Sequence, residues 1–245
     1  MQLSLAPILL AAELGILFAA AARSVSIATP ARSMTPVYAY FSWLTLYGIV
    51  TSVLGYRGVY IDDELMQYLP GFWLQLITVA AAVAPVLLIA SVRDGLRHIA
   101  DHIPWHWIAY FQAMRIAALG TLAKTASNEF PLYFEILIGL PDLAFGISAL
   151  WIARKAMRGE LTARGFMIWN IIGALIIVPA APILLQLGLP GPVQVFTSLP
   201  DARAVFTYPM SIAPMIGVPL FVLVNIGVAW RLWERSRQTT AVSYS

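Results

Sequence analysis

The sequence contains no cysteine and only two lysines, Lys124 and Lys155. The absence of cysteine excludes disulfide bonds, cysteine-ligated metal sites and thiol catalysis. The chain also lacks a block of basic residues and any nucleic-acid-binding motif, so no nucleic-acid partner is expected. The function must therefore be sought in other residue types and in their placement along the chain.

Charge is scarce as well. Only 11% of the residues are charged and 60% are hydrophobic, and the mean hydropathy is +0.79. A typical soluble domain is about 25% charged. This composition places the chain in the membrane class.

A transmembrane helix needs about 20 mostly apolar residues, and seven stretches meet this requirement. The expected spans are 4–22, 36–55, 71–92, 104–123, 131–153, 165–188 and 209–231. The loops between them are short and leave no room for a soluble domain. The sequence therefore predicts an all-α integral membrane bundle of seven transmembrane helices, which forms a single transmembrane domain over residues 1–245.

Basic residues are distributed unequally between the loops on the two sides of the expected bundle. One side holds eleven: Arg23, Arg32, Arg93, Arg97, Arg154, Lys155, Arg158, Arg164, Arg231, Arg235 and Arg237. The other side holds three: Arg57, Lys124 and Arg203. By the positive-inside rule, the C-terminus is cytoplasmic and the N-terminus is outside. The asymmetry also favours an odd number of crossings.

The first apolar stretch differs from a secretory signal peptide. A signal peptide carries basic residues ahead of its apolar run, whereas here the positive charges follow the run and Glu13 lies in its middle. The sequence AAAARS does resemble a cleavage site. We nevertheless expect residues 4–22 to be retained as a span.

Four charged side chains lie within the expected spans: Glu13, Arg115, Glu135 and Asp142. A charge at the bilayer centre costs about 3 kcal/mol on insertion scales, so these residues should face the bundle interior and are candidates for function. Arg115 and Asp142 lie near the middle of two spans joined by the short connection 124–130. We predict that they form an ion pair, because an unpaired buried charge costs far more. Glu13 lies at similar depth and is a candidate second carboxylate for the same guanidinium.

Other polar residues surround this predicted pair. Gln112 lies one turn from Arg115 on the same helix face. Glu135 and Asp142 are seven residues apart, which places them on one face of a regular helix, with Glu135 about 10 Å nearer the outside. We therefore expect Glu135 to line an outward-facing path to the pair. Pro141 cannot donate to the carbonyl four residues earlier and predicts a kink. Further prolines in the last two spans also predict breaks: Pro179, Pro182, Pro209, Pro214 and Pro219.

No cofactor is predicted. A retinal Schiff base needs a lysine in the last span, and none is present there. A haem between helices needs histidines inside the spans, whereas the one histidine within an expected span, His106, lies at its end. The three histidines are His98, His102 and His106, which are too few for a membrane di-iron site. Pro104 also interrupts their helical spacing, so a metal site is disfavoured.

The fourth and fifth expected spans contain a loose pattern: Gln112-x2-Arg115, then Pro131-x2-Phe134, then Gly139-x2-Asp142-x3-Gly146. In this pattern the chain resembles a set of uncharacterised bacterial multi-pass membrane proteins. The resemblance implies a location in the cytoplasmic membrane of a bacterium. It implies no activity.

Three functions remain open. The first is the binding or passage of a proton, ion or small solute at Glu13, Gln112, Arg115, Glu135 and Asp142, with Glu13 and Asp142 as switchable carboxylates and Arg115 as anchor. The second is a non-catalytic subunit or receptor that docks membrane protein partners, or a second copy, through its helices; Arg115 and Asp142 would then be a structural clamp. The third is a small enzyme that modifies lipid. A water-lined path would favour the first function, a dry closed pair the second and a lateral opening to lipid the third.

Overall fold

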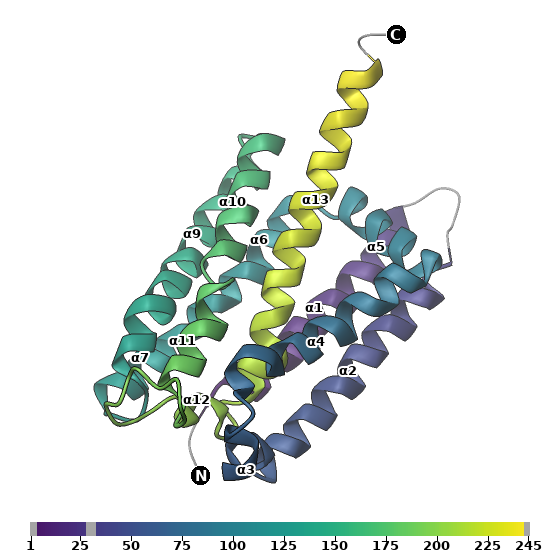
Figure 1. The fold of residues 1–245 in the computed structure, drawn as a ribbon. Coiled ribbons are helices and arrows are strands. Elements are labelled where there is room, and N and C mark those ends of the chain that lie inside the picture. Colours follow the sequence, from purple (N-terminus) through teal and green to yellow (C-terminus); the bar gives the residue numbers. More distant parts are fainter. Residues whose placement is uncertain (1–3, 28–32, 243–245) are drawn as a thin grey trace.

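The computed structural model describes residues 4–27 and 33–242, and these residues form helices and loops without a strand. Among them, six helices are long and apolar enough to cross a membrane. Three are α1 (Ala6–Ile27), α2 (Thr35–Tyr56) and α4 (Pro70–Leu88). The other three are composite helices over Leu132–Met157, Ala163–Gly188 and Ala213–Gln238. The helices lie side by side in a bundle (Figure 1), so the predicted all-α membrane architecture is confirmed at this level.

The expected fourth span, 104–123, is divided into three pieces. They are α6 (Trp105–Ala113), the 3-10 turn η2 (Met114–Ala118) and α7 (Leu119–Ala126). Arg115 lies within η2. A stretch of 3-10 helix inside a longer helix often marks a hinge or a strained sequence. No piece is long enough to cross a bilayer alone, so the described residues contain six long apolar helices where seven were expected.

The expected third span, 71–92, ends early. α4 stops at Leu88, one turn after Pro85, and Ile89 has an extended backbone. The chain then turns into α5 (Ala90–His102), which buries Val92 and Gly95 and is otherwise polar or charged along much of its length. A helix with this charge density is not stable in hydrocarbon, which explains why the apolar span ends before it.

The prolines of the last three spans interrupt regular helix, as predicted, and the form of the interruption varies. The π turn η3 (Glu135–Gly139) lies between α8 (Leu132–Phe134) and α9 (Leu140–Met157), just before Pro141. A second π turn, η4 (Ala213–Gly217), contains Pro214 and precedes α13 (Val218–Val242). A π turn bonds residue i to residue i+5 and is frequent at functional sites. Between α10 (Ala163–Leu175) and α11 (Ala180–Gly188), a turn ends at Pro179.

Three short helices lie at one end of the bundle: η1 (Val59–Ile61), α3 (Asp63–Met66) and α12 (Arg203–Phe206). Within the bundle, α6 packs along α9 and α10 packs along α13. The backbone of η2 approaches α9 most closely at Gly146, where an added Cβ would lie 2.8 Å from the Ile116 nitrogen. This close packing positions Arg115 against α9.

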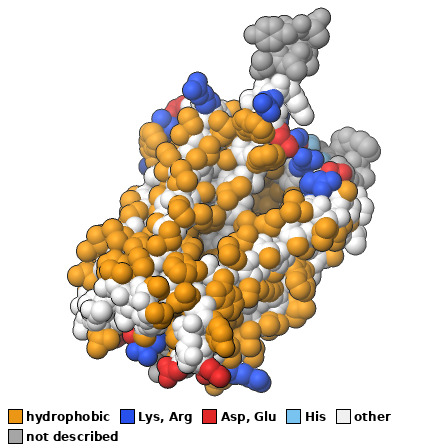
Figure 2. All heavy atoms as spheres, viewed as in Figure 1, with side chains coloured by type: hydrophobic (Ala, Val, Ile, Leu, Met, Phe, Trp, Pro, Cys, Tyr) orange, Lys and Arg blue, Asp and Glu red, His pale blue; other side chains and the backbone are white. Residues whose placement is uncertain are grey.

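The surface of the bundle is divided by polarity. On the face seen in Figure 2, hydrophobic side chains cover the long side of the bundle, whereas lysine, arginine and carboxylate side chains gather at its two ends. Exposed apolar residues on several helices include Ile8, Ile49, Leu88, Ile147 and Leu175. Such a surface suits lipid, and six of the helices are long and apolar enough to cross a membrane, so the chain is a membrane protein.

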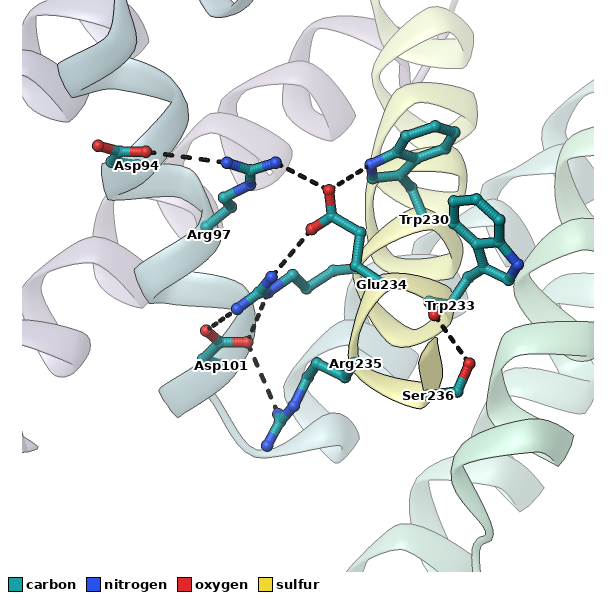
Figure 3. A network of polar contacts seen from close by, with 9 residues as sticks. Asp94, Arg97, Asp101, Trp230, Trp233, Glu234, Arg235 and Ser236 are labelled. Atoms are coloured by element: carbon teal, nitrogen blue, oxygen red, sulfur yellow. Dashed lines mark hydrogen bonds and ion pairs between the residues drawn. The ribbon is translucent and has the colours of Figure 1, made fainter. Parts of the chain in front are cut away.

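A network of ion pairs fastens α5 to α13 (Figure 3). The Glu234 carboxylate accepts hydrogen bonds from Arg97 at 2.8 Å, from Arg231 at 2.9 Å and from the Trp230 ring nitrogen at 2.8 Å. Arg231 also donates two hydrogen bonds to Asp101, at 2.9 and 2.7 Å. We call Arg97, Asp101, Trp230, Arg231 and Glu234 the α5–α13 network. It lies at the end of the bundle from which α13 projects (Figure 1).

Candidate functional site

Arg115 and Asp142 form an ion pair in the middle of the bundle, as predicted. The Arg115 Nη1 atom donates to Asp142 Oδ1 at 2.8 Å and to the Gly173 carbonyl at 3.1 Å. The Arg115 side chain is fully buried and that of Asp142 is 14% exposed. The guanidinium is thus held between η2, α9 and α10, and the short connection between α7 and α8 brings its carboxylate partner into reach.

Aromatic rings flank the same guanidinium. Its Cζ atom lies 4.9 Å from the ring centroid of Phe145 and 5.2 Å from that of Phe221. Cation–π contacts of this kind are strongest when they are desolvated. The Nε and Nη2 atoms are buried and have no hydrogen-bond partner among the described residues. One edge of the guanidinium is therefore free to donate.

Glu13 is buried in α1 without a hydrogen-bond partner among the described residues. Its carboxylate lies against Gly217 at the end of the π turn η4, where an added Cβ would lie 3.5 Å from Oε1 and 3.7 Å from Oε2. Arg115 lies within electrostatic range, yet no hydrogen bond joins the two side chains. The structure therefore corrects the expectation that Glu13 shares the guanidinium directly with Asp142.

Glu135 differs from its predicted role. Its side chain is 1% exposed and folds back over Gly139, four residues later, where an added Cβ would clash with the carboxylate. Neither oxygen accepts a hydrogen bond of ordinary geometry from the described residues, although the Thr121 hydroxyl is close enough to interact. The π turn η3 holds more residues per turn than an α-helix. A spacing of seven residues therefore no longer places Glu135 and Asp142 on one face of the helix.

Gln112 lies near the pair but bonds elsewhere. Its Nε2 atom donates to the Phe221 carbonyl at 3.2 Å, and its Oε1 atom is buried without a partner among the described residues. This hydrogen bond therefore links α6 to α13. This places Gln112 beside the site without a hydrogen bond from its side chain to Arg115 or Asp142.

Asn225 belongs to the site and was missed from the sequence. It is fully buried in α13, and neither its Oδ1 nor its Nδ2 atom has a partner among the described residues. An added Cβ at Gly173 would lie 2.5 Å from Nδ2, so the amide adjoins the carbonyl that accepts from Arg115. Its position within the apolar run VLVNIGV was an available signal, because amides are as unusual as charges at mid-membrane.

A cavity of about 1240 Å³ reaches the Arg115–Asp142 pair, and both residues line it. Its wall is mainly apolar, with Phe130, Phe134, Ile138, Pro214, Val218 and Phe221 among the lining residues. Polar side chains enter the wall at Gln75, Thr121, Lys124, Ser127 and Glu129. Neither Glu13 nor Glu135 lines this cavity. Thr121, Lys124 and Glu129 line the cavity, whereas Glu135, which was expected to line a path to the pair, does not.

The cavity also approaches the lipid-facing surface. Three of its lining residues, Ile8 on α1, Leu76 on α4 and Ile226 on α13, are 68%, 60% and 49% exposed. These residues are apolar, so the rim of the cavity on this side suits acyl chains better than water. The lining also includes the exposed Glu129, between α7 and α8.

The histidines lie outside this site. The rings of His98 and His102 are 4.1 Å apart between centroids, and His102 Nδ1 contacts the His98 carbonyl at 2.9 Å. Within residues 4–27 and 33–242, no cluster of three or more histidine, aspartate or glutamate side chains has the geometry to hold a metal ion. In the described residues, the histidines therefore add no set of metal ligands to the Arg115–Asp142 pair.

Comparison with known proteins gives one match. Residues 71–233 match a family described as a domain of unknown function (DUF8737). Neither the curated proteins nor the solved structures gave a match. The matched segment contains Arg115, Glu135, Asp142 and Asn225, while Glu13 precedes it. Because the match covers more than half of the chain, the protein belongs to the DUF8737 family.

Proposed function

We propose that this membrane protein binds a small, largely apolar solute in the cavity, with the Arg115–Asp142 pair as its polar anchor. The observation that carries the proposal is the cavity itself, which reaches the pair and is lined by Arg115 and by Asp142, whose side chain is 14% exposed. The Nε and Nη2 donors of Arg115 are buried and lack partners among the described residues, and buried donors are rarely left unpaired in proteins. An oxygen atom of a bound solute would satisfy them after a turn of the guanidinium toward the cavity.

The shape and lining of the cavity indicate the class of solute. Sites for small molecules usually measure about 300–1,000 Å³ and combine an apolar wall with a few polar groups. This cavity is somewhat larger, and its charged lining residues are the pair and, nine residues after Arg115 and beyond, Lys124 and Glu129. An elongated amphipathic molecule with an acidic or carbonyl head fits this distribution.

The cavity also argues against a pair that serves only as a clamp, because that alternative predicts a dry, closed pair without a cavity beside Arg115 and Asp142. The cavity therefore favours a binding role over the purely structural alternative. Its opening toward lipid is also the feature expected of a lipid-modifying enzyme, which stays the second candidate.

We also propose that α6, η2 and α7 together make a seventh crossing, with the N-terminus outside and the C-terminus in the cytoplasm. The three pieces follow one another without an intervening loop, and Arg115 in the middle piece is neutralised by Asp142. The loop charges support this orientation, because Arg57, Lys124 and Arg203 are outnumbered by the eleven basic residues of the other loops.

Binding can be tested with a fatty acid that carries a fluorescent dansyl group, titrated into purified protein in detergent. Gly120 lines the cavity, and an added Cβ there meets open space, so Gly120→Phe should fill the cavity without a backbone clash. We expect saturable binding to the wild type and at least about tenfold weaker binding to the variant, a loss of about 1.4 kcal/mol.

Gly227→Phe is the matched control. Gly227 also lies in a helix with open space at its Cβ, but it does not line the cavity. Its variant should bind the probe like the wild type. Equal affinity of the wild type and Gly120→Phe, or a signal that never saturates, would contradict a solute site in this cavity.

A further inference from the structure

The Arg115 guanidinium has two carboxylates within its electrostatic range, Glu13 and Asp142, while Glu135 on η3 is a third buried carboxylate near Asp142. Arg115 and Glu13 are fully buried, and Asp142 is nearly so. If both carboxylates were ionised, the group would carry a net negative charge in a medium of low dielectric constant, which is strongly unfavourable. A neutral group requires that Glu13 and Asp142 share one proton.

The hydrogen bonds indicate where that proton lies in this structure. Asp142 accepts from Arg115 at 2.8 Å, as an ionised carboxylate does. Glu13 accepts no hydrogen bond from the described residues and packs against the glycine that ends η4. This is the environment of a neutral carboxyl group, so the proton belongs to Glu13.

Among the residues that the structure describes, no other charged group competes at Glu13. The elements that pack against α1 are α2, α5, α6, η2 and η4. α2 carries tyrosines, α6 carries His106 and Tyr110, and η4 has no titratable residue. α5 carries its charges outside the apolar span, and η2 supplies Arg115. The charge on Glu13 is therefore governed by Arg115 and, through it, by Asp142.

We infer that Glu13 and Asp142 are alternative counter-ions of Arg115 and that one exchangeable proton is held between them. In the observed state the proton is on Glu13 and the guanidinium bonds to Asp142. In the alternative state the proton has moved from Glu13 to Asp142, and the guanidinium turns its free edge, Nε and Nη2, to Glu13. The net charge stays at zero throughout, because one proton is transferred and none is gained.

The cavity gives this proton a route to solvent. Asp142 lines the cavity, whereas Glu13 does not, so Glu13 exchanges its proton through Asp142. The proposal goes beyond solute binding and makes the site a proton-binding switch between α1 and α9. It is tested without a solute, so its outcome is independent of the fatty-acid titration.

Infrared spectroscopy of the purified protein tests the inference directly, because a protonated carboxyl group has its own C=O stretching band. All variants are compared in a Glu135→Gln background, which removes the other buried carboxylate. We expect one such band at neutral pH, with a shift on transfer to D2O. Glu13→Gln should remove it.

Asp142→Asn distinguishes a shared proton from a merely neutral Glu13. When Asp142 can no longer be the counter-ion, Glu13 must ionise to neutralise Arg115, so the band should disappear in this variant too. Arg115→Gln should instead increase the band, because neither carboxylate then has a cation. If Arg115→Gln does not fold, Asp142→Asn and Glu13→Gln still decide the matter.

Two results would overturn the inference. A band that persists in Asp142→Asn would show that Glu13 is neutral independently of Asp142. The absence of any band in the Glu135→Gln background would show that no proton is held at the site. Thermal melting is a second test. The double variant Glu13→Gln/Asp142→Asn should lose more stability than the two single variants together, because Arg115 then has no counter-ion.

Discussion

The residues around Arg115 show how small side chains hold a buried charge in place. Gly146 brings the backbone of η2 against α9, with an added Cβ only 3.0 Å from the Arg115 carbonyl carbon. Gly173 offers its carbonyl to Arg115, and Gly217 adjoins the Glu13 carboxylate. An added Cβ at Gly146 or Gly173 would collide with its neighbours, whereas at Gly217 it would make ordinary contact with the Glu13 carboxylate.

Gly146→Ala should therefore destabilise the protein. Because the new methyl group would meet backbone atoms of Ile116 and Arg115, the neighbours cannot move aside as a flexible side chain would. We expect a loss of about 1–3 kcal/mol, as for other overpacked cores, measured as a lower melting temperature in detergent. Gly15→Ala is the control, because nothing lies within 4 Å of its added Cβ; it should be neutral or slightly stabilising. Equal melting of the wild type and Gly146→Ala would contradict the close packing of η2 on α9.

At this scale the sequence predicted the ion pair but not its surroundings. Arg115 and Asp142 could be paired because charges in hydrocarbon require partners and because a short connection joins their spans. The separation of Glu13 from the guanidinium depends on how α1 packs against η4, which is a tertiary property. Asn225 interrupts an apolar run in the same way, but it lies far from the pair in sequence, so spacing alone did not connect it to Arg115 as it did Gln112.

The helices of this protein lie close to the predicted spans, but several of them are less regular than an α-helix. Pro141, Pro179 and Pro214 correctly predicted irregular backbone, because proline lacks the N–H that a regular helix needs. Whether the helix near such a proline is kinked, contains a π turn or is broken depends on the neighbouring helices. The π turn η3 changed the face of Glu135, and the 3-10 turn η2 divided the fourth span, and neither has a signature in residue spacing.

The α5–α13 network gives a prediction about one helix. Glu234→Gln removes the carboxylate that accepts from Arg97, Arg231 and Trp230. Partly exposed ion pairs contribute up to about 1 kcal/mol each, so amide hydrogen exchange in α5 should become about fivefold faster or more. Asp94→Asn is the control, because Asp94 pairs with Arg97 at 3.9 Å on the exposed side of α5. If the two variants exchange alike, the network does not hold α5 in place.

The whole molecule must accommodate both the six long helices and the divided segment 105–126. α1 begins at one end of the bundle, and α13 projects from the other (Figure 1). Chain ends on opposite sides of a membrane require an odd number of crossings. Six long helices alone give an even number, so the proposed seventh crossing by α6, η2 and α7 reconciles the count with the arrangement.

The absence of cysteine allows a direct test of this topology, because a single introduced cysteine is the only one that a maleimide reagent can label. Ser127, between α7 and α8, and Glu160, between α9 and α10, are both exposed. In intact cells of a bacterial host, a membrane-impermeant maleimide should label Ser127→Cys at once and Glu160→Cys only after the membrane is permeabilised. Labelling of both in intact cells would contradict a crossing between the two sites by Leu132–Met157. Labelling of Glu160→Cys alone would keep the crossings and reverse the orientation, so that the eleven basic loop residues would lie outside, against the charge rule from which the orientation was derived.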